Sequence, residues 1–187
     1  QAKVINLAMM YGMGVNKLAD QVDIEKEEAK ALTKQYHERV PFVRQLMQGV
    51  SRRLDDPRSS GSIRSLKGRK CRFDLWEPDS FDMHKALPKD EALAEYGPTT
   101  RLKRAYTYKA LNRLIQSSSA DMTKVAMVDS FEAGHVPLLQ VHDELAFSVA
   151  DEAEATTHAA RMEKAIELSI PNKCDVEIGK SWGESGI

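Results

Sequence analysis

The chain has 187 residues, of which 42% are hydrophobic and 29% charged, and its formal net charge is −1. This composition is typical of an ordinary globular protein with one or two domains, and no apolar run approaches the length that crosses a bilayer. Its two cysteines lie far apart without metal-ligand spacing, which favours a reducing compartment such as the cytoplasm over a secreted disulfide scaffold.

A helix is predicted over residues 1–11, ending before two closely spaced glycines. It starts at Gln1 without a capping residue before it, so we expect a piece of a longer protein or a product of cleavage or splicing. Lys3, Leu7 and Tyr11 are spaced four apart and form one helical ridge. Such a ridge can clamp a nucleotide, with lysine on phosphate and tyrosine on base or sugar. A partly buried helix with a surface lysine is the simpler alternative.

Two further helices are predicted between Asp20 and Val50, with Asp23 as the cap of the first and Pro41 between them. The apolar residues at helical spacing are Ala29, Leu32 and Tyr36 in the first helix, and Phe42, Val43, Leu46 and Val50 in the second. We expect these faces to pack against the rest of the molecule, and we assign them no chemistry.

Residues 55–73 begin as a loop and then predict a short hairpin with Lys67-Gly68 in its turn. The basic residues in and before it are Arg52, Arg53, Arg58, Arg64, Lys67, Arg69, Lys70 and Arg72, opposed only by Asp55 and Asp56. A second basic cluster consists of Arg101, Lys103 and Arg104. Basic patches on a nearly neutral protein indicate either an anionic partner, such as a phosphate backbone, or a solvated face.

Residues 77–97 carry Pro78, Pro88 and side chains of mixed charge, and Pro98 follows them. We predict an irregular loop or insertion there.

A long helix is expected over residues 101–131, ended by Gly134. Lys109, Asn112 and Gln116 share one face of it. Amide side chains there can contact the minor-groove edges of base pairs, although an exposed polar face is the plain alternative.

The stretch Leu138–Val149 has two short apolar runs around His142, Asp143 and Glu144. The runs predict a hairpin of buried strands with the three polar residues at its tight end. Adjacent carboxylates between apolar strands need a positive partner, and oxygen ligands suit Mg²⁺ or Mn²⁺. A wet, charged hairpin tip is the alternative.

After this hairpin, Asp151 and Glu154 predict a capped helix that continues to about Ser169. The alternation of Cys174–Ile178 predicts a final strand.

The segments KVINLAMMYG, LKGRK, LNRLIQSSSAD and QVHDEL, in this order, resemble the C-terminal part of a family A DNA polymerase of the bacterial polymerase I and phage type. The resemblance extends over nearly the whole chain, to SWGES near its end. It implies an α/β (α+β) fold. Residues 1–100 would be a fingers region with the basic hairpin and the insertion, and residues 101–187 a palm portion with a small antiparallel sheet.

The resemblance also implies roles in template-directed transfer of dNTPs onto primed DNA. Lys3 would bind the phosphates of the incoming nucleotide, Leu7 would face its sugar, and Tyr11 would lie beside the templating base pair. Asp143 would bind two Mg²⁺ ions together with another aspartate, and Glu144 would be an accessory carboxylate. Residues expected along primer and template are Asn112, Gln116, Gln140, His142 and Lys109, with Arg64, Lys67 and Arg69 of the hairpin.

The sequence departs from the family pattern in two ways. The first metal-binding aspartate motif is absent, and Asp129 lies in a helical stretch and is a poor substitute. We therefore expect the chain to need an upstream polymerase polypeptide that carries the missing aspartate. Leu7 stands where the family usually has Phe or Tyr, and leucine also occurs there in some phage-type relatives. The change to leucine predicts altered discrimination against dideoxynucleotides.

Two other functions remain open. The first is a non-catalytic DNA-binding module that keeps the basic hairpin and the polar helix face. A metal-dependent hydrolase built on His142 and Asp143 would need further ligands. The remaining histidines show no spacing that recruits them; they are His37, His84, His135 and His158.

Overall fold

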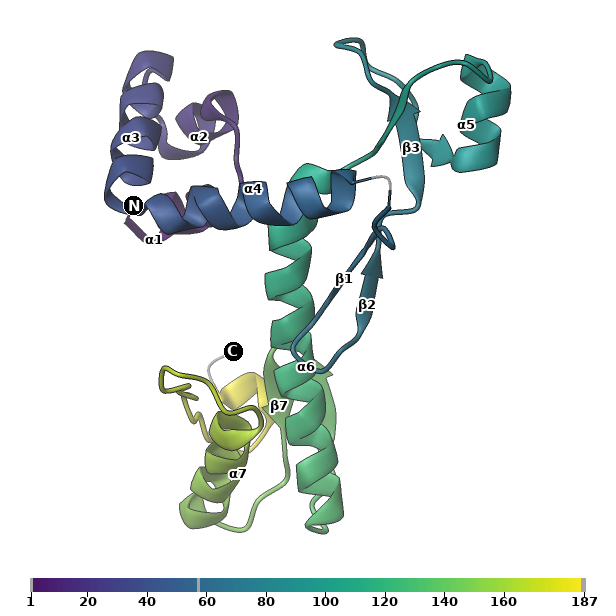
Figure 1. Ribbon diagram of the computed structural model, residues 1–187. Helices are drawn as coiled ribbons and strands as arrows, with labels where there is room; N and C mark the ends of the chain where they lie inside the picture. Colours follow the sequence, from purple (N-terminus) through teal and green to yellow (C-terminus); the bar gives the residue numbers. More distant parts are fainter. Residues whose placement is uncertain (1, 57, 186–187) are drawn as a thin grey trace. The chain divides into compact units, whose positions relative to one another are not determined.

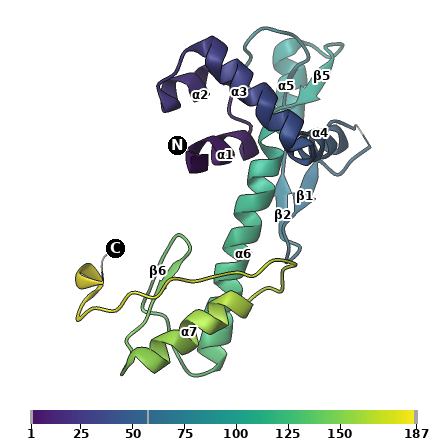
Figure 2. The same cartoon turned by 90° about the vertical axis from the view of Figure 1, so that its left-hand side faces the viewer.

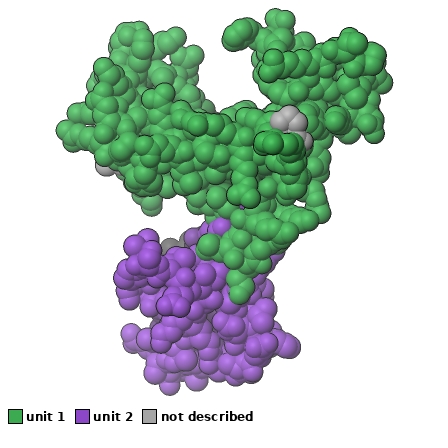
Figure 3. Space-filling view, viewed as in Figure 1, with its two compact units in different colours: residues 1–115 green, residues 116–187 purple. Residues whose placement is uncertain are grey.

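The computed structural model describes residues 2–56 and 58–185. The chain divides into two compact units, Gln1–Ile115 and Gln116–Ile187, and the division falls within one long helix (Figures 1 and 3). Helices combined with small antiparallel sheets confirm the predicted α/β (α+β) class. Within residues 2–56 and 58–185, no helix is both long and apolar enough to span a membrane.

The first unit opens with four helices, α1 (Ala2–Met10), α2 (Val15–Val22), α3 (Lys26–Arg39) and α4 (Pro41–Asp55). The first three share a small core of alanine, leucine and methionine side chains: Ala8, Met9, Leu18, Ala19 and Ala29. The prediction that Asp23 caps the next helix is wrong. Asp23 ends α2 in the left-handed conformation, which aspartate tolerates better than most residues, and Glu25 precedes α3.

The apolar face predicted for α4 is only partly covered. Val43 is buried, whereas Phe42 is 61% and Leu46 47% exposed. The spacing of these residues fits a helix, but helical spacing alone does not decide which turns meet a neighbour.

The predicted basic hairpin is confirmed. Strands β1 (Ser62–Arg64) and β2 (Lys70–Arg72) pair antiparallel, and Gly68 occupies the turn with φ +82°. A backbone with that φ is unstrained only in glycine, which is why this residue marks the turn. Ile63 belongs to a buried cluster with Leu54, Phe73 and Ala110.

The prediction of an irregular stretch over 77–97 is only partly confirmed, because residues 79–86 are irregular but regular elements occupy most of the rest. Strands β3 (Leu75–Pro78), β4 (Leu87–Pro88) and β5 (Leu102–Arg104) form an antiparallel sheet in the order β4-β3-β5, and α5 (Lys89–Tyr96) packs against it. These strands have only two to four residues, too few to show a period of two. Their pairing partners are distant in sequence, so only the folded chain reveals them.

Helix α6 (Ala110–Glu132) starts nine residues later than predicted, because β5 and a 3₁₀ turn (Thr107–Lys109) precede it. Its predicted end is confirmed. Gly134 has φ +84°, and the N–H of His135 donates to the carbonyl of Ser130 at 2.9 Å. This pattern satisfies a carbonyl at the helix terminus.

The second unit contains the predicted hairpin, as β6 (Leu139–Val141) and β7 (Glu144–Ala146), followed by α7 (Glu152–Lys164) and a 3₁₀ turn (Trp182–Glu184) (Figure 2). The hairpin is confirmed, but the burial predicted for its strands is not: Leu139 of β6 is 42% exposed, and Leu138, just before this strand, is 70% exposed. A two-stranded ladder covers neither of its own faces, and the described residues add no third strand to it.

The capped start of α7 is confirmed, since the Asp151 carboxylate accepts from the Glu154 N–H at 2.9 Å. The helix ends at Lys164, short of the predicted end, where Glu167, Leu168 and Ser169 are exposed and no packed face supports another turn. The final strand predicted over Cys174–Ile178 is wrong. That segment is irregular and lines a groove with α7 and the hairpin, without a ladder partner among the described residues.

Candidate catalytic hairpin and nucleic-acid surfaces

The acidic hairpin, defined as β6, β7 and their connection, presents its polar residues at a tight end. Val141 pairs with Glu144, so His142 and Asp143 alone connect the strands. His142 has φ +53°, a conformation suited to short hairpin connections. The side-chain amide of Gln140 donates to the His142 carbonyl at 2.6 Å and ties the turn to β6. The backbone therefore presents Asp143 at the hairpin tip and Glu144 at the start of β7.

Asp143 and Glu144 are both exposed, and neither contacts a cationic side chain in the part of the chain that the structure describes. Two adjacent carboxylates without a positive neighbour offer the hard oxygen ligands that Mg²⁺ prefers. The residues present thus fit part of a magnesium site. Asp143 does not belong to a group of three potential ligands among the described residues, so further ligands would have to come from elsewhere.

The ridge on α1 is accessible. Lys3 is exposed and Leu7 is 40% exposed, while the neighbouring Ala8 and Met9 are buried in the helical core. Tyr11 lies just beyond α1, half-buried, and its N–H donates to the Leu7 carbonyl at 2.9 Å. The helical hydrogen-bond pattern thus continues through Tyr11, which supports the predicted spacing of the three side chains.

The basic hairpin (β1, β2 and their turn) exposes Arg64, Lys67 and Arg69. Arg64 donates to the Gly68 carbonyl at 2.8 Å, which holds its guanidinium beside the turn. The Ser65 N–H donates to the Arg69 carbonyl at 2.9 Å and closes the turn from the other side. The hairpin therefore presents cations on an ordered turn.

The second basic cluster has a different part in the fold. Arg101 and Lys103 contact the Asp79 carboxylate at 3.2 and 3.8 Å. Arg104 donates to three backbone carbonyls, those of Leu54, Ser59 and Phe73. Arg104 therefore stabilises the first unit internally, and Arg101 and Lys103 already pair with Asp79. An anionic partner is thus better matched by the basic hairpin.

The polar face predicted on the long helix is only partly as expected. Asn112 is half-buried and Gln116 exposed, one turn apart on α6 and on either side of the boundary between the units. Lys109 lies in the preceding 3₁₀ turn, and its ammonium group is 4.9 and 5.5 Å from the ring centroids of Tyr106 and Tyr108.

The model of DNA polymerase family A matches residues 1–184. The chain belongs to DNA polymerase family A. It is 40% identical to a DNA-directed DNA polymerase of Pseudomonas phage M6 over 158 residues, which cover 84% of this chain and 20% of that protein. It is 35% identical to DNA polymerase I of Treponema pallidum over 192 residues, which cover 98% of this chain and 17% of that one. These relatives confirm the resemblance to polymerase I and phage-type enzymes.

The fold agrees with a solved family structure. The polymerase domain of Pol1 from M. smegmatis, in complex with DNA primer-template and dNTP, superposes with a TM-score of 0.68 at 31% identity. The match covers 96% of this chain and 30% of that one. This chain spans about a fifth of the length of the curated family A relatives it matches.

One cluster in this family A chain escaped the sequence analysis. His135 and His158 lie together with Glu154, although no spacing of the histidines suggested it. The available signal was the interval between Glu154 and His158, which places them one turn apart on a helix. His135 belongs to the loop after α6, and only the fold brings it close.

Proposed function

We propose that this chain supplies the nucleotide-contacting helix and one metal-binding aspartate of a DNA-directed DNA polymerase. Catalysis would require an upstream polymerase polypeptide that carries the other metal-binding aspartate. The observation behind this proposal is the pair of exposed carboxylates, Asp143 and Glu144, at a two-residue hairpin connection in a family A chain. Within this proposal, residues 1–100 form the fingers region and residues 101–187 the palm portion.

Asp143 and Glu144 would hold Mg²⁺, or Mn²⁺ in its place. A pair of such ions, when bound, lowers the barrier to attack by the primer 3′-hydroxyl and stabilises the pyrophosphate leaving group. The chain's own contribution is positioning. The Gln140 contact to the His142 carbonyl orders the turn, and both side chains would lie beside the primer terminus.

The α1 ridge would bind the incoming dNTP. The Lys3 ammonium would meet the triphosphate, Leu7 the sugar, and Tyr11 the templating base pair. Exposure of Lys3 and Leu7 supports this role, because a ligand can reach them without displacing the helical core. Movement of such a helix onto the nucleotide would exclude water and bring positive charge to the phosphates.

Primed DNA would contact the remaining predicted residues. Asn112 and Gln116 on α6 would reach the minor-groove edges, with Lys109 beside them. Arg64, Lys67 and Arg69 of the basic hairpin would contact the phosphate backbone, a sequence-independent interaction suited to a polymerase.

The test is complementation. The chain is mixed with an upstream fragment of a family A polymerase that contains the missing aspartate, and primer extension is measured with Mg²⁺. We expect extension from the mixture, loss of extension with Asp143→Ala, and normal extension with Asp129→Ala. Asp129 is a matched control because it is an exposed aspartate of the same unit, on α6. Extension that survives Asp143→Ala would contradict the proposed role of this carboxylate.

A second candidate is a non-catalytic DNA-binding module, favoured by the exposed cations of the basic hairpin. It predicts binding of primed DNA by the chain but no extension with any complementing fragment. The hydrolase alternative gains no support, because the three-ligand group among the described residues includes neither His142 nor Asp143.

Leu7 would set the preference between dNTPs and dideoxynucleotides. In the complemented enzyme, we expect Leu7→Phe to change the ratio of their incorporation rates, because a ring would fill space beside the sugar. An unchanged ratio would remove Leu7 from the sugar contact.

A further inference from the structure

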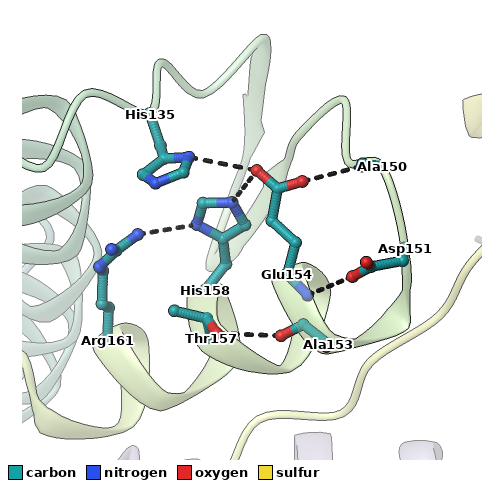
Figure 4. Close-up of polar contacts among 8 residues, drawn as sticks. All are labelled: His135, Ala150, Asp151, Ala153, Glu154, Thr157, His158 and Arg161. Carbon is teal, nitrogen blue, oxygen red and sulfur yellow. Dashed lines mark hydrogen bonds and ion pairs between the residues drawn. The ribbon is translucent and has the colours of Figure 1, made fainter.

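Three potential metal ligands converge within the second unit (Figure 4). His135 comes from the loop after α6, and Glu154 and His158 lie one turn apart on α7. The Nδ1 atom of His135 is 3.3 Å from Oε1 of Glu154, and Nε2 of His158 is 4.0 Å from the same oxygen. All three ligand atoms lie within 4.8 Å of one another. The proposed polymerase function uses none of these residues.

The ring of His158 is fixed and has an unused nitrogen. The residue is only 4% exposed, and its ring stacks on Phe147 at 3.9 Å between centroids with the planes 2° apart. Its Nε2 atom is buried without a hydrogen-bond partner, on the side of the ring that faces Glu154. A buried polar atom without a partner in a native protein calls for an explanation, such as an ion that occupies the space beside it.

Glu154 is oriented by its other contacts. Its Oε2 atom accepts from the Ala150 N–H at 2.8 Å, and its backbone N–H donates to Asp151 at 2.9 Å. These bonds leave Oε1 directed at the two imidazoles, as Figure 4 shows.

The surroundings of His158 favour its neutral form. Burial lowers the pKa of His158, the neighbouring His135 and Arg161 lower it further, and Glu154 opposes them. A neutral imidazole has one ring lone pair, and a cation beside Glu154 needs that lone pair on Nε2, with the proton on Nδ1.

We propose that His135, Glu154 and His158 bind Zn²⁺, or a similar borderline divalent cation, at a site distinct from the Asp143 carboxylates. Two imidazoles and one carboxylate form a donor set typical of zinc and unlike the all-oxygen sets of Mg²⁺. Bonds of about 2.1 Å in a tetrahedral site place ligand atoms about 3.4 Å apart. His135 and Glu154 already meet that spacing. The Nε2 atom of His158 lies about 0.6 Å beyond it from Oε1 of Glu154, and the ring must also approach His135, since the three ligand atoms are within 4.8 Å of one another. The bound ion would cross-link the loop after α6 to α7.

Arg161 gives the proposal a specific signature. Its Nη1 atom is 3.3 Å from Nδ1 of His158, and a guanidinium can only donate, so Nδ1 accepts and the proton resides on Nε2. A metal on Nε2 requires the proton on Nδ1 instead, and Arg161 must then withdraw. Arg161 therefore opposes metal binding, whereas the carbonyl of a glutamine at this position can accept a hydrogen bond from the Nδ1–H of His158.

The experiment is a calorimetric titration of the full chain with Zn²⁺, repeated with Co²⁺ to record the absorption of a tetrahedral site. We expect one equivalent to bind, and His135→Gln or Glu154→Gln to weaken binding at least about tenfold, the size that even outer-shell changes cause. The matched controls His84→Gln and Glu152→Gln, outside the cluster, leave the affinity unchanged. Arg161→Gln increases it, which a purely hydrogen-bonded histidine network would not predict.

Glu154→Gln keeps the acceptor for the Ala150 N–H, and circular dichroism verifies that each variant is folded. Failure of the parent chain to bind Zn²⁺ would overturn the proposal. Retained affinity in both His135→Gln and Glu154→Gln would also overturn it, as would binding that only Asp143→Asn removes. None of these outcomes depends on primer extension, so the metal site and the polymerase function fail separately.

Discussion

The two hairpins of this chain have similar backbones, but they differ in how much buried structure packs against them within their own units. Each pairs two three-residue antiparallel strands, β1 with β2 and β6 with β7. The basic hairpin is joined to the buried core of its unit, whereas the acidic hairpin has exposed apolar residues at its strands. The same local motif is thus packed against a buried core in one unit, and has an exposed, charged turn and exposed apolar residues in the other.

The anchoring of the basic hairpin is specific. Ile63 and Phe73 are 8% and 3% exposed, and Arg104 donates to the Phe73 carbonyl from the neighbouring sheet. Arg113 on α6 lies over the Phe73 ring at 4.8 Å and donates to the Arg72 carbonyl. Around the acidic hairpin, Leu138 and Leu139 remain 70% and 42% exposed. Substitutions at buried residues beside the basic hairpin should therefore cost more stability than substitutions in the acidic hairpin.

The largest expected contrast is at Asp143. Asp143→Ala should abolish primer extension in the complemented enzyme while changing the free energy of unfolding by less than about 0.5 kcal/mol, as for other exposed sites. Extension assays and urea denaturation of the same preparation test both parts. Loss of activity accompanied by a large loss of stability would show that Asp143 supports the fold instead.

The next contrast compares Phe73 with Leu139. Phe73→Ala should destabilise the first unit by about 3–5 kcal/mol, because it leaves a cavity among buried side chains. Leu139→Ala should cost about 1 kcal/mol or less, since a large part of its surface is already in water. Urea denaturation measures both losses in the free energy of unfolding. Equal losses would contradict the inference that the basic hairpin is more firmly packed than the acidic one.

Arg104 tests the anchoring through hydrogen bonds. Arg104→Lys keeps the charge but loses the fork that reaches the carbonyls of Leu54, Ser59 and Phe73, and it should cost about 1–3 kcal/mol. The control is Arg101→Lys, whose exposed ion pair with Asp79 should contribute little. A cost for Arg101→Lys that matches or exceeds that of Arg104→Lys would contradict the internal role of Arg104.

The smallest effect is expected from Lys67. Lys67→Ala should weaken binding of primed DNA modestly and lower the slope of log affinity against log salt by about 0.9, the contribution of one phosphate contact. Lys34→Ala, an exposed lysine on α3, is the control. Fluorescence anisotropy at several salt concentrations measures the slope, and an unchanged slope would remove Lys67 from the DNA contact.

Local signals in the sequence predicted most of the turns and caps, with Asp23 as the exception. Gly134 ends α6, Asp151 caps α7, Lys67 and Gly68 lie in the basic turn, and the connection at His142 and Asp143 closes the acidic hairpin. Each of these depends on interactions among a few neighbouring residues, so the residue types determine them directly. The family resemblance had the same local basis, in short motifs that keep their order along the chain.

Tertiary structure decided what depends on contacts between distant residues. The pairing of β3 with β5, the use of Arg104 as a carbonyl anchor, and the exposure of Leu139 in β6 all lay beyond the sequence pattern. The approach of His135 to His158 is a further example, since the intervening hairpin separates them along the chain. Residue types and spacing specify local backbone geometry, whereas burial and long-range pairing depend on how the whole chain packs.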